Sequence, residues 1–238
     1  IREMLAGGLF LDGEAAWILQ NRGWGEYIGT EVTPGSEAAF CYEGIRRPEE
    51  YPNAEGKLMY NLIFAPAGSE GGSFYELKPS SGCEVITDFL DPQEQPVIPG
   101  MIRFENKLGG RVAIMAFKLG GNRSSALFSY KKKEIVRQTI EWLGKQALPV
   151  FVKDLPNVFC IFNTPPSGGR AVATIISLNS DPFDSFSLDV APEWVGAKVE
   201  ILGNDGQWKT AITETTDRTI TVKKALSLMT PVILKFLC

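Results

Sequence analysis

A short apolar run that leads directly into an acidic turn, within residues 7–16, constrains the fold of this chain most strongly. Residues 9–11 are Leu-Phe-Leu, which is typical of a strand covered on both faces in a parallel sheet. Asp12 follows at the position of a helix N-cap, where its carboxylate can accept backbone N–H groups, and Glu14 adds negative charge to the first turn. Residues 15–19 supply a helix body. The stretch therefore predicts a strand–helix unit of an α/β domain.

The segments up to residue 148 predict the rest of this domain. The first five residues are expected to end a helix. Residues 33–72 are rich in Pro, Gly and Glu, which predicts irregular strands and long loops. Residues 129–145 have helical periodicity, with Val136, Ile140 and Leu143 on one face. Further apolar runs predict strands at 83–89, 96–106 and 111–117.

The pattern changes at Pro149, after which short β-branched runs alternate with turn residues such as Asn204-Asp205-Gly206. This predicts a small antiparallel β-sandwich, so we expect an α/β domain over residues 1–148 and an all-β domain over 149–238. The expected strands are residues 158–162, 171–178, 186–190, 198–202, 219–222 and 232–237.

The composition excludes several classes of function. The chain contains no histidine, so no Ser-His-Asp or Cys-His relay and no His-ligated metal can form within it. Its four cysteines form no Cys-x-x-Cys pair, and we expect no metal and no cofactor. A net charge of −4 and a pI near 5.1 predict no nucleic-acid partner. The one basic run, residues 131–133, is interpreted as a solvated helix start.

No apolar run reaches the roughly 20 residues that span a bilayer, so we expect no membrane association. Because the chain starts with Ile1 in the middle of an α/β pattern, we expect it to be the C-terminal piece of a longer polypeptide. We expect a cytoplasmic location, with export left open because the native N-terminus is expected upstream.

Three stretches carry a family resemblance: residues 83–117, 140–152 and 171–182. In this order they resemble the trailing domains of large bacterial glycoside hydrolases of family forty-two. These are β-galactosidases whose catalytic barrel is followed by a class I glutamine amidotransferase-like domain and a small C-terminal β-sandwich. Residues 109–112, Gly-Gly-Arg-Val, match the turn that precedes a late strand of that domain.

The resemblance implies a partial flavodoxin-like fold and a non-catalytic role in domain packing or oligomerisation. It also implies the catalytic barrel of the same polypeptide as a partner, and a homo-oligomer. The residues support a non-catalytic role on independent grounds, because a glutaminase needs a cysteine in a Gly-x-Cys-x-Gly elbow. Cys41 lies in Phe-Cys-Tyr-Glu and Cys83 in Gly-Cys-Glu, and neither is such an elbow.

Glycoside hydrolysis needs only two carboxylates, so the lack of histidine does not exclude it. Asp12 and Glu14 are the catalytic candidates, because ligands of open α/β sheets bind at the carboxyl ends of strands. Helix capping is the simpler interpretation of both residues. Trp194 and Trp208 are candidate platforms for sugar stacking, with packing in a core as the alternative.

Three hypotheses follow for the function. The leading one is a non-catalytic region of a glycoside hydrolase with a structural or assembly role. The alternatives are a carbohydrate-binding module and a carboxylate-dependent hydrolase.

Overall fold

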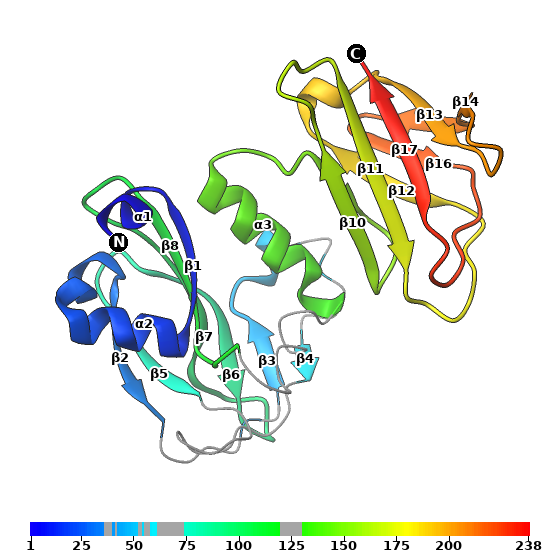
Figure 1. The fold of residues 1–238 in the computed structure, drawn as a ribbon. Helices are drawn as coiled ribbons and strands as arrows, with labels where there is room; N and C mark the ends of the chain where they lie inside the picture. Colours follow the sequence, from blue (N-terminus) through cyan, green and yellow to red (C-terminus); the bar gives the residue numbers. More distant parts are fainter. Residues whose placement is uncertain (36–39, 41, 52–53, 55–57, 61–73, 120–129) are drawn as a thin grey trace. The chain divides into compact units, whose positions relative to one another are not determined.

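The computed structural model describes residues 1–35, 40, 42–51, 54, 58–60, 74–119 and 130–238. Contacts divide the chain into two compact units, Ile1–Gln146 and Ala147–Cys238 (Figure 1). Each unit has its own hydrophobic core. Within the described ranges, no helix is both long and apolar enough to cross a membrane.

The first unit is built on a mixed sheet with the strand order β1-β8-β7-β6-β3-β4, beside a two-stranded sheet of β2 and β5 (Figure 1). Its regular elements are α1 (Arg2–Ala6), β1 (Gly8–Asp12), α2 (Gly13–Leu19), β2 (Thr30–Pro34), β3 (Tyr42–Ile45), β4 (Leu58–Tyr60), β5 (Tyr75–Pro79), β6 (Glu84–Leu90), β7 (Pro96–Glu105), β8 (Arg111–Met115) and α3 (Lys133–Gly144). Short helical turns lie at Gln20–Trp24, Gly25–Tyr27, Pro48–Glu50 and Tyr130–Lys132.

The predicted strand–helix unit is confirmed, because β1 ends at Asp12 and α2 begins at Gly13. α2 ends at Leu19, and the helical turn that follows it, Gln20–Trp24, contains Gly23, whose φ of 85° is left-handed and favours glycine. Strand β1 pairs in parallel with β8, and Leu11 is buried while Leu9 and Phe10 are half-buried.

The expectation of a parallel sheet is wrong for the rest of this ladder. β8 with β7, β7 with β6, β6 with β3 and β3 with β4 are all antiparallel pairs. For β6, β7 and β8 the reason is the length of the connections: residues 91–95 and 106–110 are tight turns, which can join antiparallel neighbours but not parallel ones. The described strands therefore do not show the flavodoxin-like half-sheet that the resemblance implies.

Helix α3 lies within the predicted helix, but its buried face differs from the predicted one. Ile135, Thr139 and Leu143 are buried, whereas Ile140 is 36% exposed. Thr139 is buried because its hydroxyl donates to the Ile135 carbonyl and accepts from Arg103. A hydrophobic periodicity cannot reveal a polar side chain of this kind.

Much of the irregular region predicted over residues 33–72 lies outside the described residues, as does Cys41. Within it, Phe40 is buried and packs edge-on against Phe74, with ring centroids 5.1 Å apart. The apolar run from residue 58 contributes β4.

The second unit consists of two antiparallel sheets, β10-β11-β17-β13-β14 and β15-β16-β12-β9, that share one core. This arrangement agrees with the predicted β-sandwich. All six predicted strands are present, and three short ones were missed. The strands are β9 (Val150–Val152), β10 (Val158–Asn163), β11 (Arg170–Ser177), β12 (Phe186–Val190), β13 (Lys198–Leu202), β14 (Trp208–Thr210), β15 (Thr213–Thr216), β16 (Thr219–Val222) and β17 (Val232–Leu237).

Candidate functional site

Asp12 lies at the carboxyl end of β1, and both of its carboxylate oxygens accept backbone hydrogen bonds. Oδ1 accepts from the Ala15 N–H at 2.7 Å, which is the predicted N-cap of α2. Oδ2 accepts from the Leu119 N–H at 2.8 Å, in the segment that follows β8. Asp12 therefore caps the N-terminus of α2 and also links the end of β1 to a segment distant in the sequence.

Glu14 lies in the first turn of α2 and forms an ion pair with Lys118. Lys118 Nζ donates to Glu14 Oε1 at 2.7 Å, and both side chains are more than a third exposed. This hydrogen bond is the main cause of the raised pKa of the Lys118 ammonium. The two candidate carboxylates thus lie on the same turn, as predicted, and each is engaged by other groups of the chain.

A buried ion pair between Lys132 and Glu43 was not predicted. Their side chains are only 5% and 3% exposed. Glu43 Oε1 also accepts from the Thr87 hydroxyl at 2.6 Å, and the Lys132 ammonium lies 4.7 Å from the centroid of the Phe117 ring. The interpretation of residues 131–133 as solvated is therefore wrong for Lys132, because a buried carboxylate from β3 compensates its charge.

Arg103 on β7 is a second buried cation that the sequence did not identify. Its Nη2 donates to the Thr139 hydroxyl at 2.6 Å, and its guanidinium carbon lies 5.5 Å from the centroid of the Trp142 ring. Burial lowers the pKa of this guanidinium. The guanidinium carbon of Arg111, on β8, also lies 5.1 Å from the centroid of the Trp142 ring, so Trp142 anchors α3 on the sheet.

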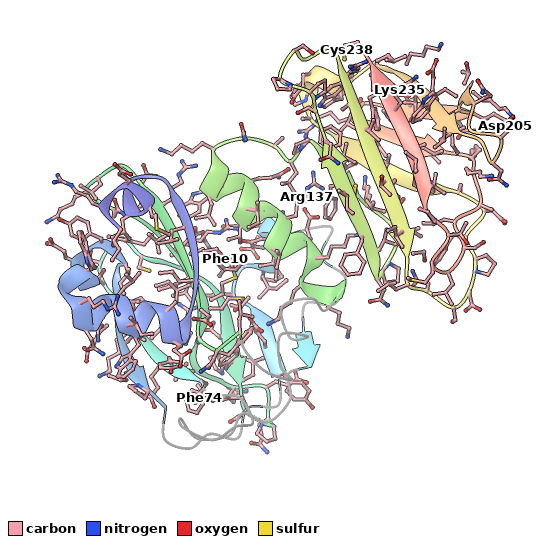
Figure 2. The ribbon with its side chains drawn as sticks, in the orientation of Figure 1. Phe10, Phe74, Arg137, Asp205, Lys235 and Cys238 are labelled. Atoms are coloured by element: carbon pink, nitrogen blue, oxygen red, sulfur yellow. The ribbon has the colours of Figure 1, made fainter. Side chains whose placement is uncertain are left out.

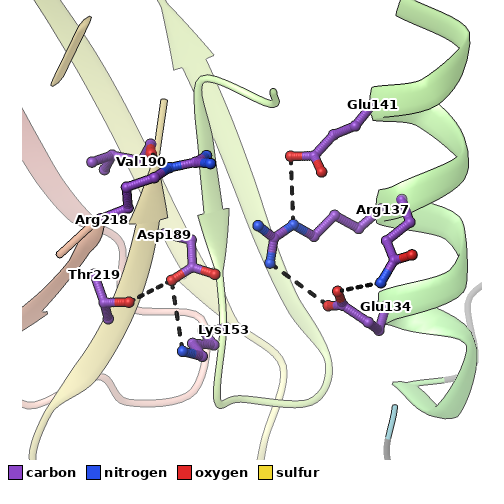
Figure 3. A network of polar contacts seen from close by, with 9 residues as sticks. Glu134, Arg137, Glu141, Lys153, Asp189, Val190, Arg218 and Thr219 are labelled. Carbon is purple, nitrogen blue, oxygen red and sulfur yellow. Dashed lines mark hydrogen bonds and ion pairs between the residues drawn. The ribbon is translucent and has the colours of Figure 1, made fainter. Parts of the chain in front are cut away.

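Arg137, on α3, forms ion pairs with two largely buried carboxylates of the same helix (Figure 3). Its guanidinium lies between Glu134, one turn before it, and Glu141, one turn after it, at 3.6 and 3.5 Å. In the second unit, Asp189 accepts from the Thr219 hydroxyl at 2.7 Å and lies 3.9 Å from the Lys153 ammonium (Figure 3). These contacts join oppositely charged or hydrogen-bonded groups in structural positions.

Trp194 belongs to the core of the second unit. It is 6% exposed, and its ring centroid lies 5.8 Å from that of Phe162 and 6.2 Å from that of Phe236. The indole packs edge-on against both neighbours, which is a favourable aromatic geometry. This burial leaves no ring face for a sugar.

Trp208 on β14 is 37% exposed and lies beside a charged cluster. The ammonium of Lys235, on β17, lies 4.3 Å from the centroid of the Trp208 ring. Figure 2 shows the position of Lys235. Glu200 accepts from Lys198 at 2.8 Å and pairs with Lys235 at 2.6 Å, and these bonds lower the pKa of its carboxyl. Of the two tryptophan candidates, Trp208 alone keeps part of its ring accessible.

The cysteines described in the structure are unpaired thiols. Burial raises the pKa of Cys83 and of Cys160 to about 11 each, so neither is an activated nucleophile. Among the described residues, no group of three or more His, Cys, Asp or Glu side chains is placed to hold a metal ion.

Comparison with known proteins relates the chain by its fold alone. No family model matches the sequence, and no curated protein matches it. The structure is similar to the α-L-fucosidase isoenzyme 2 from Paenibacillus thiaminolyticus, with a TM-score of 0.53 and 10% identity over 88% of this chain. A GH42 β-galactosidase from G. stearothermophilus matches over 84% of this chain at 12% identity, but its TM-score of 0.38 does not indicate a shared fold. The chain spans 34% of the fucosidase and 24% of the β-galactosidase, and thus resembles in fold about a third of the α-L-fucosidase.

Proposed function

We propose that this chain is a non-catalytic region of a glycoside hydrolase, with a structural role in packing and assembling the parent enzyme. The observation that carries the proposal is the engagement of Asp12, whose two oxygens accept the Ala15 and Leu119 amides. The similarity to part of an α-L-fucosidase supports the choice of parent enzyme. The family resemblance adds the catalytic barrel of the same polypeptide as the partner of this region.

A glycosidase site needs one carboxyl group that protonates the leaving group and a second carboxylate that attacks or activates water, roughly 5 to 10 Å away. Asp12 directs its oxygens at backbone amides of its own chain, and Glu14 directs one oxygen at Lys118. A substrate would have to displace these bonds to reach either group. The arrangement therefore favours helix capping and segment fastening over acid–base chemistry.

The test is a hydrolysis assay of the purified 238-residue chain on aryl glycosides, including an α-L-fucoside and a β-galactoside. We expect no release of the aryl group above the enzyme-free rate. Hydrolysis that disappears in Asp12→Asn or Glu14→Gln, with the fold retained, would instead establish the carboxylate-dependent hydrolase. Lys78→Gln, a change at another exposed ion pair, serves as the matched control.

Trp208 supports a second candidate function, carbohydrate binding by the second unit. Its partly exposed ring lies next to hydrogen-bonding groups of Lys235 and Glu200, a combination suited to a sugar ring. Affinity electrophoresis in gels that contain polysaccharide tests this candidate. Retardation that is lost in Trp208→Ala and kept in Ile212→Ala, at an exposed residue of the same unit, would support it. Equal mobility with and without polysaccharide would refute it.

A further inference from the structure

The edge strand β10 of the second unit lacks the protection that edge strands normally carry. It is the first strand in the order β10-β11-β17-β13-β14 and lies at one edge of that sheet (Figure 1). Its sequence, Val-Phe-Cys-Ile-Phe-Asn, contains no charge, no proline and no glycine. Exposed edges without charges, prolines or bulges readily pair with another strand.

The other edges of the two sheets are protected in the usual ways. β14 has only three residues, one of which is the exposed Lys209. β15 carries Glu214, whose side chain is 71% exposed. β9 is also three residues long and is followed by Lys153. The long, uncharged edge of β10 is therefore an exception within its own unit.

The backbone of β10 presents an open row of donors and acceptors. Leu178 N–H donates to the Asn157 carbonyl at 2.9 Å, so residue 157 directs its polar groups toward β11. Because this direction alternates along an antiparallel strand, Val158, Cys160 and Phe162 direct theirs away from β11. Within the described part of the chain, no backbone hydrogen bond outside the sheet reaches these three residues.

The side chains of β10 match this open edge. Phe159 and Ile161 are 57% and 54% exposed, although large apolar side chains are usually covered. They point to the same side of the sheet, opposite Ile176 and Thr174 of β11. Their alternation with half-buried neighbours gives β10 one core face and one uncovered apolar face.

We propose that β10 pairs antiparallel with β10 of a second copy of this chain, about a two-fold axis at Cys160. This register places Phe159 opposite the partner's Ile161, and Ile161 opposite the partner's Phe159, on the same side of a sheet that continues across both copies. An axis midway between two residues would instead oppose exposed and core-facing side chains. Since the strand is uncharged, self-pairing brings no like charges together, and aromatic–β-branched pairs stabilise antiparallel neighbours.

This pairing is a specific form of the assembly role in the proposed function. It rests on that role, and it does not depend on which enzyme the parent protein is. Sedimentation equilibrium of the 238-residue chain tests it, and we expect a dimer. Ile161→Lys should give a monomer, because two-fold symmetry places the new charge twice in the interface. Ile212→Lys, at a residue 73% exposed and outside β10, should remain a dimer. Far-UV circular dichroism of each variant shows whether it is folded.

Disulfide trapping tests the register. In this register, residue 159 of one copy and residue 161 of the other form a non-hydrogen-bonded pair. Their Cα atoms would lie about 4.5 Å apart, a distance that a disulfide can bridge. In a Cys160→Ser, Cys238→Ser background, the double variant Phe159→Cys, Ile161→Cys should give a covalent dimer on oxidation. Either single variant should give little covalent dimer, because its new thiol would face an apolar residue of the other copy and not a second thiol.

Two results would overturn the proposal. One is a parent chain that stays monomeric at all concentrations, and the other is a dimer that Ile161→Lys leaves intact. Single cysteine variants that cross-link as well as the double variant would overturn the register. None of these results would alter the outcome of the hydrolysis assay, so the non-catalytic assignment stands or falls separately.

Discussion

The Leu119 amide donates a 2.8 Å hydrogen bond to Asp12 Oδ2, across 107 residues of sequence. The same carboxylate caps α2 through the Ala15 amide. Asp12 therefore combines a local role at a helix end with a long-range role that holds the segment after β8 against the end of β1. This double use accounts for an acidic residue at the carboxyl end of a strand without a catalytic role.

Asp12→Ala should lower the free energy of unfolding of the first unit by about 1–3 kcal/mol, since a cap and a second amide bond are both lost. Asp12→Asn should lower the free energy of unfolding by less, because its amide oxygen can still cap α2. The remaining loss is the bond to the Leu119 amide, which the NH₂ group cannot accept. Urea unfolding followed by circular dichroism measures both changes. Equal stability of Asp12→Ala and the parent chain would contradict the assignment, and Glu214→Ala in the other unit is the control.

Lys132→Met should destabilise the first unit by about 3–5 kcal/mol, because it leaves the buried Glu43 carboxylate without its cation. Adding Glu43→Gln should recover part of this loss, since the remaining buried charge is removed. A double-mutant cycle by urea unfolding measures the coupling. The exposed Lys118→Met should have a much smaller effect, and a comparable effect would contradict the difference in burial.

Gly110→Ala should destabilise the first unit strongly. An added Cβ would lie 1.9 Å from the Leu5 carbonyl oxygen, and backbone on both sides would have to move. Asn106 lies on the same turn and donates to Leu5 at 2.8 Å, so a displacement would also disturb this bond. Gly25→Ala is the matched control, because its Cβ would come no closer than 3.4 Å to any atom of Gln20, which is an ordinary van der Waals contact. Thermal unfolding should show a large loss for the first variant only.

Cys83 and Cys160 should react slowly with iodoacetamide at pH 8, because burial raises their pKa to about 11 and little thiolate is present. The exposed Cys238 should react faster than either of them. Mass spectrometry of timed digests measures each rate, and equal rates in the folded chain would contradict the burial of the two thiols.

The same two thiols should make stability depend on pH in the alkaline range. Their pKa values are raised from 9.0 in the unfolded chain to about 11 in the folded one. Their contribution is therefore complete below pH 9 and is lost as the pH rises to about 11. Replacing both by Ala should remove this part of the decline in unfolding free energy between pH 9 and 11.

Local signals in the sequence predicted many of the elements. The cap at Asp12 and the six strands of the second unit follow from residue type and period, and the structure confirms them. The strands β9, β14 and β15 have only three or four residues, which is too short for an alternation to be recognised. The turn at residues 204–206 is also confirmed, since it joins β13 to β14 and Gly206 has a φ of 76°.

Long-range relationships could not be predicted from the sequence. The sheet was expected to be parallel because β1 is apolar, but the pairing of β6, β7 and β8 depends on the turns between them. The burial of Lys132 depends on Glu43, which no local pattern connects to it. For the candidate site, the position of Asp12 was predictable and its bond to Leu119 was not. On sequence alone Trp194 and Trp208 are equivalent candidates, and only their burial in the structure distinguishes them.

The most direct test of the central claim uses the complete polypeptide that the source gene encodes. Its hydrolysis of aryl glycosides should be measured for the parent and for the double variant Asp12→Asn, Glu14→Gln. A non-catalytic role for this region predicts the same kcat per folded molecule in both, with a lower unfolding midpoint in the variant. A folded variant that has lost turnover would contradict the account and place the chemistry at the end of β1.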